Sequence, residues 1–165
     1  MHPTGMSDSA NTLPKKIRSA MVELLQARLA EVLDGASQAR QAHWNVKGPG
    51  FFALHELFDK AADQLAGHAD DLAERLVTLG GRAEGTVRRV ARTTGIPEFP
   101  PGVVSGHEHV KALATNLGVL AERLRRAIDD ADKAGDKVTA DLFTGVAGEL
   151  DKLVWQIDAH RRARD

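Results

Sequence analysis

Five side chains between positions 43 and 74 are potential ligands for a hard metal ion: His43, His55, Asp59, Asp70 and Glu74. His55 and Asp59 are four residues apart, as are Asp70 and Glu74, so each pair would share one face of a helix. Asp59 and Asp70 are eleven residues apart. That spacing places both pairs on roughly one stripe, but about 16 Å apart along the helix axis.

A single metal ion cannot connect these two pairs within one chain, because metal–ligand bonds are only about 2.0–2.6 Å long. Two antiparallel copies of the helix could bring His55 and Asp59 of one chain opposite Asp70 and Glu74 of the other. The spacing therefore predicts a metal site between subunits. Imidazoles with carboxylates suit iron, and zinc or manganese could occupy the same ligands. The chain has no cysteine, which excludes thiolate sites.

Each of the five side chains also has an ordinary structural interpretation. A single histidine such as His43 or His55 is more often a core or surface residue than a ligand. Single acids such as Asp59, Asp70 and Glu74 usually belong to solvated helix faces. The metal interpretation is favoured by the joint pattern, in which two ligand pairs share one stripe of a predicted helix and His43 lies near the end of the preceding one.

The two tryptophans have different expected roles. Trp44 directly follows His43. Its indole could pack at an interface, or it could take up oxidising equivalents from iron that would otherwise leave as radicals. Trp44 is therefore kept among the candidate catalytic residues, whereas Trp155 is expected to pack in the core.

Two further polar residues lie close to the candidate ligands in the sequence. Asp63 is one turn beyond Asp59, and it is expected to be an exposed charge or a partner of Lys60, with a supporting role near the metal as the alternative. His68 is two residues before Asp70, so it would point to the far side of the same helix. A structural role is expected for His68, with a place at another part of the subunit interface as the alternative.

Composition limits the class of protein. The 165 residues suit one domain with its own core, and Leu and Ala outnumber Val, Ile and aromatics, which favours helix. The formal net charge of −1 gives no overall electrostatic reason to bind nucleic acid. No apolar run approaches the length of a membrane span, and no signal-peptide pattern is present. A soluble cytoplasmic protein without a membrane partner is expected.

Apolar residues recur at intervals of three and four, with Gly and Pro clusters between the periodic segments. We expect a flexible tail at 1–14, a bundle at 15–162 with helices near 15–46, 51–79, 107–133 and 137–162, a crossover at 82–106 with a possible short helix at 86–93, and a C-terminal end at 163–165. Two helices, a long connection and two more helices predict an all-α, ferritin-like four-helix bundle.

Three segments resemble the Dps family of mini-ferritins: QARQAHWNVKGPGFFALHELFD, ADDLAERLVTLGG and AGDKVTADLFTGVAGELDKLVWQIDAH. The similarity extends from about residue 17 to residue 160, with HWN, LHELFD and DLAERLVTLGG in register. The resemblance implies a hollow dodecamer that oxidises Fe2+ and stores ferric mineral, which protects against oxidative damage. It also implies hydrogen peroxide as the preferred oxidant, with dioxygen acting more slowly.

The resemblance also implies roles for individual residues. His43, His55 and Asp59 match the iron ligands that one subunit supplies, and Asp70 and Glu74 match those of its neighbour. This division agrees with the spacing argument. The Glu-x-x-His motif of larger ferritins, in which one bundle holds both irons, occurs nowhere in the chain.

Acidic residues surround the predicted turn before the last helix. In the family that the chain resembles, acids at the positions of Asp132 and Asp141 line a pore on a three-fold axis. Three copies of such a carboxylate would attract Fe2+. Surface solvation is the alternative, and Asp136 is a natural helix cap at the same turn.

Six basic residues near the two ends of the fold could contact DNA: Lys15, Lys16, Arg18, Arg161, Arg162 and Arg164. Repetition in an oligomer would strengthen such salt-dependent phosphate contacts. However, the first eleven residues contain no Lys or Arg, unlike the Lys-rich tails of family members that bind DNA strongly. A nucleoid-associated, DNA-protecting protein with secondary metal binding is the alternative function. A helical assembly that binds zinc, or no metal, is the third.

Overall fold

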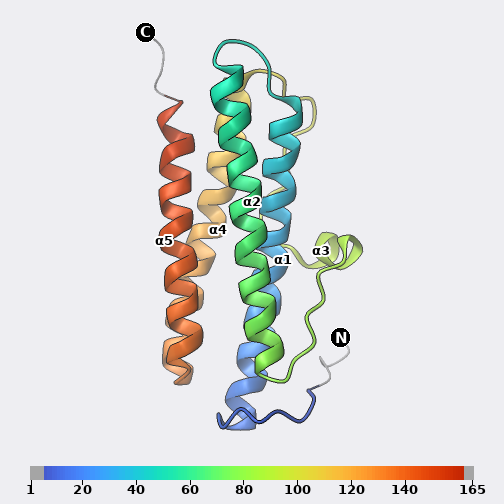
Figure 1. The fold of residues 1–165 in the computed structure, drawn as a ribbon, viewed down its shortest axis with the longest axis vertical. Coiled ribbons are helices and arrows are strands. Elements are labelled where there is room, and N and C mark those ends of the chain that lie inside the picture. The colour runs from blue at the N-terminus through green and yellow to red at the C-terminus, as the bar shows by residue number, and fades with distance from the viewer. Residues whose placement is uncertain (1–5, 162–165) are drawn as a thin grey trace.

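The structure is a computed structural model that describes residues 6–161. Four long helices form a bundle, and a short helix stands apart beside it (Figure 1). This confirms the predicted all-α bundle with a long crossover, and the crossover does contain a short helix. Within residues 6–161, no helix is both long enough and apolar enough to cross a membrane. In chain order the helices are α1 (Lys15–Asn45), α2 (Phe51–Thr78), α3 (Val87–Thr93), α4 (Gly106–Ala134) and α5 (Lys137–Ala159).

The four long helices pack as two hairpins. α1 lies beside α2 and α4 beside α5, and these pairs make the most extensive helix contacts (Figure 1). Each long helix places leucine in the interior, where a buried side chain of this size contributes about 1.5–3 kcal/mol. This core holds α1 and α2 in a fixed register. Fully buried examples, one from each long helix, are Leu25, Leu65, Leu113 and Leu150.

The turn between α1 and α2 determines which side chains of the two helices meet. Gly48 and Gly50 have φ values of 97° and 77°, a left-handed conformation that residues with a Cβ rarely adopt. Both glycines can therefore be placed in a tight turn that α2 follows immediately at Phe51. As a result the last turn of α1, which contains His43, lies next to the first turns of α2, which contain His55.

A buried ion pair joins α2 to the start of α5. Arg75 Nη2 donates to both carboxylate oxygens of Asp136, at 2.8 and 3.0 Å. Asp136 also caps α5 by accepting a hydrogen bond from the Thr139 backbone N–H, which confirms the predicted cap. Burial opposes ionisation of Asp136, but hydrogen bonds from Thr139 and Arg75 outweigh it and lower the pKa of this carboxyl. The pair is therefore charged at neutral pH.

Residues 6–14, which fall within the predicted tail, lie against the C-terminal end of α2. The Ser7 N–H donates to the carbonyl oxygen of Gly80 at 2.8 Å, and Ser9 Oγ donates to that of Thr78 at 3.1 Å. Arg18 completes the contact from α1, because its Nη1 donates to the Leu79 carbonyl oxygen at 3.0 Å. The chain thus reaches α1 by way of the far end of the α1–α2 hairpin.

Candidate metal centre

His43 and His55 face each other across the α1–α2 hairpin. His43 Nδ1 is 2.8 Å from the His55 carbonyl oxygen, and His55 Nδ1 is 2.9 Å from the His43 carbonyl oxygen. The two imidazole rings are stacked, with centroids 3.7 Å apart. Because a carbonyl oxygen can only accept, each Nδ1 carries the proton, which leaves Nε2 of the neutral ring with a free lone pair. Each neutral ring thus presents an Nε2 lone pair, the donor that a metal-binding imidazole uses.

Asp59 brings a carboxylate to the same end of the hairpin. Its Oδ1 atom is 3.8 Å from His43 Nε2. The same oxygen forms an ion pair with Arg40 of α1, and Arg40 also contacts the exposed carboxylate of Asp63. Arg40, rather than Lys60, is thus the partner of Asp63. The guanidinium group places a positive charge beside Asp59.

Sequence reasoning missed Arg40, although a signal for it exists. Arg40 precedes His43 by three residues, so the two side chains lie on one face of α1. The spacing of residues along α1 does not predict how α1 is rotated about its axis relative to α2. That rotation directs the guanidinium group to Asp59.

Asp70 and Glu74 are exposed and lie further along α2. Within residues 6–161 of one chain, no three His, Asp or Glu side chains are placed to hold a metal ion together. The structure thus brings His43, His55 and Asp59 to one end of the hairpin and leaves Asp70 and Glu74 apart from them. One chain thus contains two separate groups of the candidate ligands.

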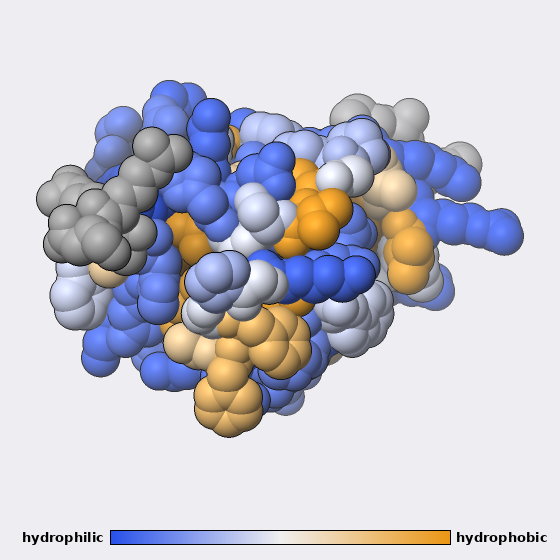
Figure 2. Space-filling view, turned by 90° about the horizontal axis from the view of Figure 1, so that it is seen from above, coloured by the Kyte–Doolittle hydropathy of each residue, from blue (hydrophilic) through white to orange (hydrophobic). Residues whose placement is uncertain are grey.

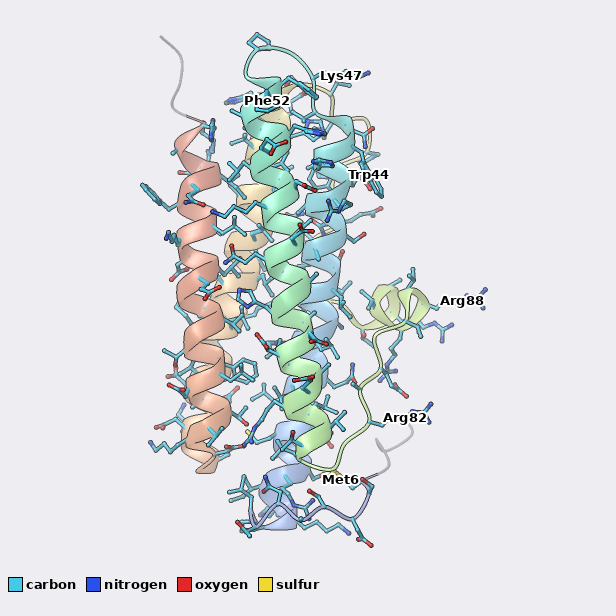
Figure 3. All side chains as sticks on the ribbon, viewed as in Figure 1. Met6, Trp44, Lys47, Phe52, Arg82 and Arg88 are labelled. Carbon is cyan, nitrogen blue, oxygen red and sulfur yellow. The ribbon has the colours of Figure 1, made fainter. Side chains whose placement is uncertain are left out.

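Exposed aromatic side chains border the histidine pair. Trp44 is 70% exposed and Phe52 is 73% exposed, and both lie near the end of the bundle where α1 meets α2 (Figure 3). Phe51 is also exposed, and its ring centroid is 5.0 Å from that of His55. Figure 2, which looks down on this end, shows an apolar patch on the surface. Such a patch is typical of a surface that another protein covers.

The second tryptophan corrects a prediction. Trp155 was expected in the core, but its side chain is 66% exposed. The buried positions of α5 include Leu150, Leu153 and Ile157. Trp155 lies midway between the last two, and at about 100° per residue it falls on the opposite face of the helix.

The acids of the predicted pore lie on the surface near the turn between α4 and α5. Asp132 is exposed and forms an ion pair with Lys137, and Asp141 is exposed on the first turns of α5. Three chains would have to meet at this turn to form the pore.

The basic residues proposed for DNA differ in how free they are. Lys15 and Lys16 are exposed at the start of α1. Arg18 is engaged with the carbonyl oxygens of Leu13 and Leu79, and Arg161 pairs with Asp158 at 2.9 Å. Two further residues of this group, Arg162 and Arg164, lie outside the described residues.

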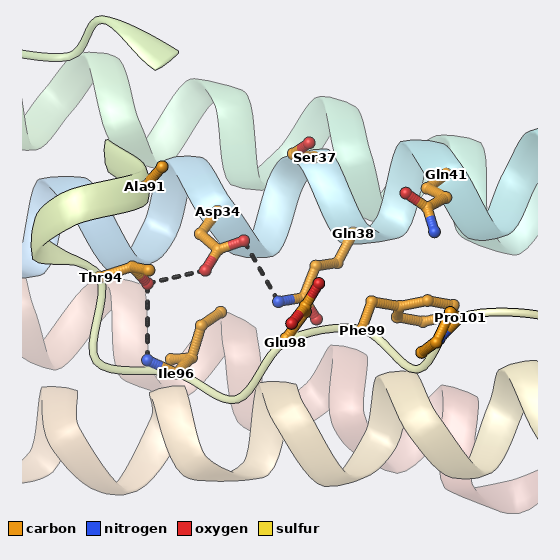
Figure 4. Close-up of a pocket in the computed structure, with 10 residues that line it drawn as sticks. All are labelled: Asp34, Ser37, Gln38, Gln41, Ala91, Thr94, Ile96, Glu98, Phe99 and Pro101. Atoms are coloured by element: carbon orange, nitrogen blue, oxygen red, sulfur yellow. Dashed lines mark hydrogen bonds between the residues drawn. The ribbon is translucent and has the colours of Figure 1, made fainter. Parts of the chain in front are cut away.

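A cavity of about 480 Å3 separates α1 from the crossover, away from the histidine pair (Figure 4). Its polar groups largely bind one another. Thr94 Oγ1 donates to Asp34 at 2.7 Å, and Gln38 Nε2 donates to Asp34 at 3.2 Å and to the Pro97 carbonyl oxygen at 2.9 Å. These bonds fix the crossover against α1, so we assign them a structural role.

Known proteins resemble this chain over almost its whole length. The ferritin family profile, described as a ferritin-like domain, matches residues 22–163. The DNA protection during starvation protein of Agrobacterium fabrum is 45% identical over 150 residues, covering 91% of this chain and 93% of that protein.

Solved structures give the same result. The Dps of Mycobacterium smegmatis aligns with a TM-score of 0.89 and 30% identity, covering 97% of this chain and 91% of that one. The Dps of Microbacterium arborescens in its high iron form aligns with a TM-score of 0.84 and 28% identity, covering 93% and 98%. With a sequence match and a fold match that both extend over nearly the whole chain, the protein belongs to the ferritin-like family and, within it, to the Dps proteins.

Proposed function

We propose that this chain oxidises and stores iron at catalytic sites that form between two subunits. Fe2+ is the substrate, and it binds to His43, His55 and Asp59 of one subunit and to Asp70 and Glu74 of its neighbour. Hydrogen peroxide, or more slowly dioxygen, accepts the electrons. Each peroxide takes up one electron from each of two ferrous ions, together with two protons, and leaves as water. The ferric product is deposited inside a hollow dodecamer.

The reciprocal bonding of His43 and His55 is the observation that carries this proposal. Two imidazoles whose Nδ1 atoms are both held by backbone carbonyl oxygens have a fixed orientation and a fixed tautomer. Such bonding is what a pair of metal ligands requires, whereas a purely structural histidine pair has no need to keep both Nε2 atoms free. The carboxylate of Asp59 beside them would offset the charge of the ion.

The exposed aromatic surface supports a site that two subunits share. The half-site formed by His43, His55 and Asp59 is bordered by Trp44, Phe51 and Phe52. A subunit that covered these aromatic side chains would also approach the two histidines. An antiparallel neighbour would then bring its own Asp70 and Glu74 to the open side. Trp44, which directly follows His43 in the sequence, would take up oxidising equivalents from the iron.

The route of iron into the cage is a separate part of the proposal. Asp132 and Asp141 would line a three-fold pore whose negative potential attracts Fe2+. Lys137 now pairs with Asp132, so this lysine would have to release the carboxylate or share it with the passing ion. DNA binding receives less support, since Arg18 and Arg161 are already engaged.

Fe2+ oxidation with stoichiometric hydrogen peroxide, followed at the ferric absorbance, tests the proposal. We expect the His43→Ala/Asp59→Ala variant to lose at least about tenfold in rate, because it lacks two ligands of each site. Asp71→Asn is the matched control, since it removes an exposed carboxylate that adjoins Asp70 on the same helix. Equal rates in the double variant and the native protein, both assembled to the same size, would exclude this site.

A further inference from the structure

His68 lies on the side of α2 that faces α5, away from the proposed iron ligands Asp70 and Glu74. The residue is only 8% exposed. Its Nε2 atom is shielded from solvent and has no hydrogen bond of adequate geometry within residues 6–161. Glu149 of α5 places Oε2 3.2 Å from this nitrogen. A buried ring nitrogen without a satisfactory hydrogen bond calls for an explanation.

A third polar group reaches the same carboxylate oxygen. Gln64 is one turn before His68, so both side chains lie on one face of α2. The terminal amide nitrogen of Gln64 is 3.2 Å from Glu149 Oε2. Rotation of the amide by half a turn would present its carbonyl oxygen instead, which is a metal ligand. Imidazole, carboxylate and amide thus converge from two helices.

The separations match the geometry of a coordinated ion. Bonds of about 2.0–2.2 Å that meet at octahedral or tetrahedral angles hold neighbouring ligand atoms about 2.8–3.6 Å apart. The two contacts at 3.2 Å fall in this range. We propose that His68, Glu149 and Gln64 form a second metal site for a divalent ion of the zinc and cobalt type. Water would complete the coordination.

The surroundings determine access and selectivity. A hollow of about 230 Å3 opens beside Gln64 and Glu149, so an ion can enter from solvent. Lys60 and Lys152 also line it and Glu149 is the one carboxylate there, so the hollow offers little to ions that depend on several carboxylates, such as Mg2+ or Fe3+. Imidazole coordination favours zinc and cobalt over those hard ions. With one carboxylate in place of three, the site differs in composition, as well as in place, from the proposed iron site between subunits.

Cobalt binding to the assembled protein tests this inference. The His43→Ala/Asp59→Ala variant serves as the background, so that the proposed iron site contributes little. In that background we expect Co2+ to bind and to develop the visible absorption of a coordinated imidazole site. Addition of His68→Gln or Glu149→Gln should weaken Co2+ binding at least about tenfold.

Asp151→Asn is the control, because it removes one negative charge from the same helix without touching the three ligands. Equal losses in Glu149→Gln and Asp151→Asn would show that only general charge matters, and they would overturn the site. Absence of Co2+ binding in the background would do so as well. Glu149 is exposed, so Glu149→Gln decides the question if His68→Gln fails to assemble. Because the background lacks the iron site, failure here leaves the proposed ferroxidase function untouched.

Discussion

Mixing two inactive variants would test whether two chains share one iron site. The first variant, His43→Ala/Asp59→Ala, lacks the imidazole side of every site. The second, Asp70→Ala/Glu74→Ala, lacks the acidic side. Each is expected to be inactive when assembled alone, because every interface then contains two damaged sites.

The expected recovery follows from two-fold symmetry. In a mixed pair of chains, one site receives both intact halves and the other receives both damaged halves. Random reassembly of equal amounts makes half of the pairs mixed, so roughly a quarter of all sites would contain the five ligands. A site within one chain is incompatible with the distance along α2, about 16 Å between the two pairs of ligands.

The assay is peroxide-driven Fe2+ oxidation after the two variants are dissociated, mixed and reassembled. A rate near a quarter of the native rate would match the shared site, and unmixed variants taken through the same procedure provide the baseline. No recovery in mixed assemblies, with native protein surviving the same treatment, would refute the reasoning. Recovery would also show that neither variant is inactive merely through misfolding.

Two further perturbations follow from the ion pairs of the structure. Arg40→Gln removes the guanidinium that pairs with Asp59, in a pair whose side chains are 33% and 39% exposed. Such a pair is worth about 1 kcal/mol, so Co2+ should bind to the proposed iron site up to about fivefold more tightly. The cobalt titration uses a Glu149→Gln background, in which the second proposed site contributes little, and weaker binding would instead make Arg40 a positioning residue. Asp136→Asn keeps a capping side chain but leaves Arg75 unpaired, and should cost about 1–3 kcal/mol in urea unfolding at pH 7. The pKa of Asp136 is lowered in the folded state, so its contribution to the free energy of unfolding is fully present above the unfolded-state pKa of about 3.9 and is lost as the pH falls through the folded-state pKa. The difference in stability between variant and native protein should therefore shrink below about pH 4. A difference that stays constant with pH would contradict this.

The helices could be predicted because their signals are local. Apolar residues repeat at helical spacing, and Gly48, Gly50, Gly80 and Gly135 mark the turns with positive φ. The predicted ends differ from the observed ends by only a few residues, with the largest difference at the end of α5, which stops at Ala159. Helix ends depend on capping bonds and fraying, which periodicity does not specify.

The candidate site could be predicted only in part. Spacing along a single helix gives the stripe, but the mutual bonding of His43 and His55 depends on how the turn sets α1 against α2. The partner of Asp59 depends on the same rotation, and the contact of His68 with Glu149 joins residues far apart in the chain. The prediction that Trp155 packs in the core was wrong, because the register of α5 turns this side chain outward.

A divided site has a consequence for the order of events in the cell. Under the proposed arrangement, a newly made chain carries two half-sites and no working one. Iron oxidation would begin only when two chains associate, which is also the first step in forming the shell that encloses the ferric product. Until then Arg40 partly neutralises the carboxylates of the waiting half-site. Assembly would thus prevent iron oxidation by free chains, which could not retain the ferric product.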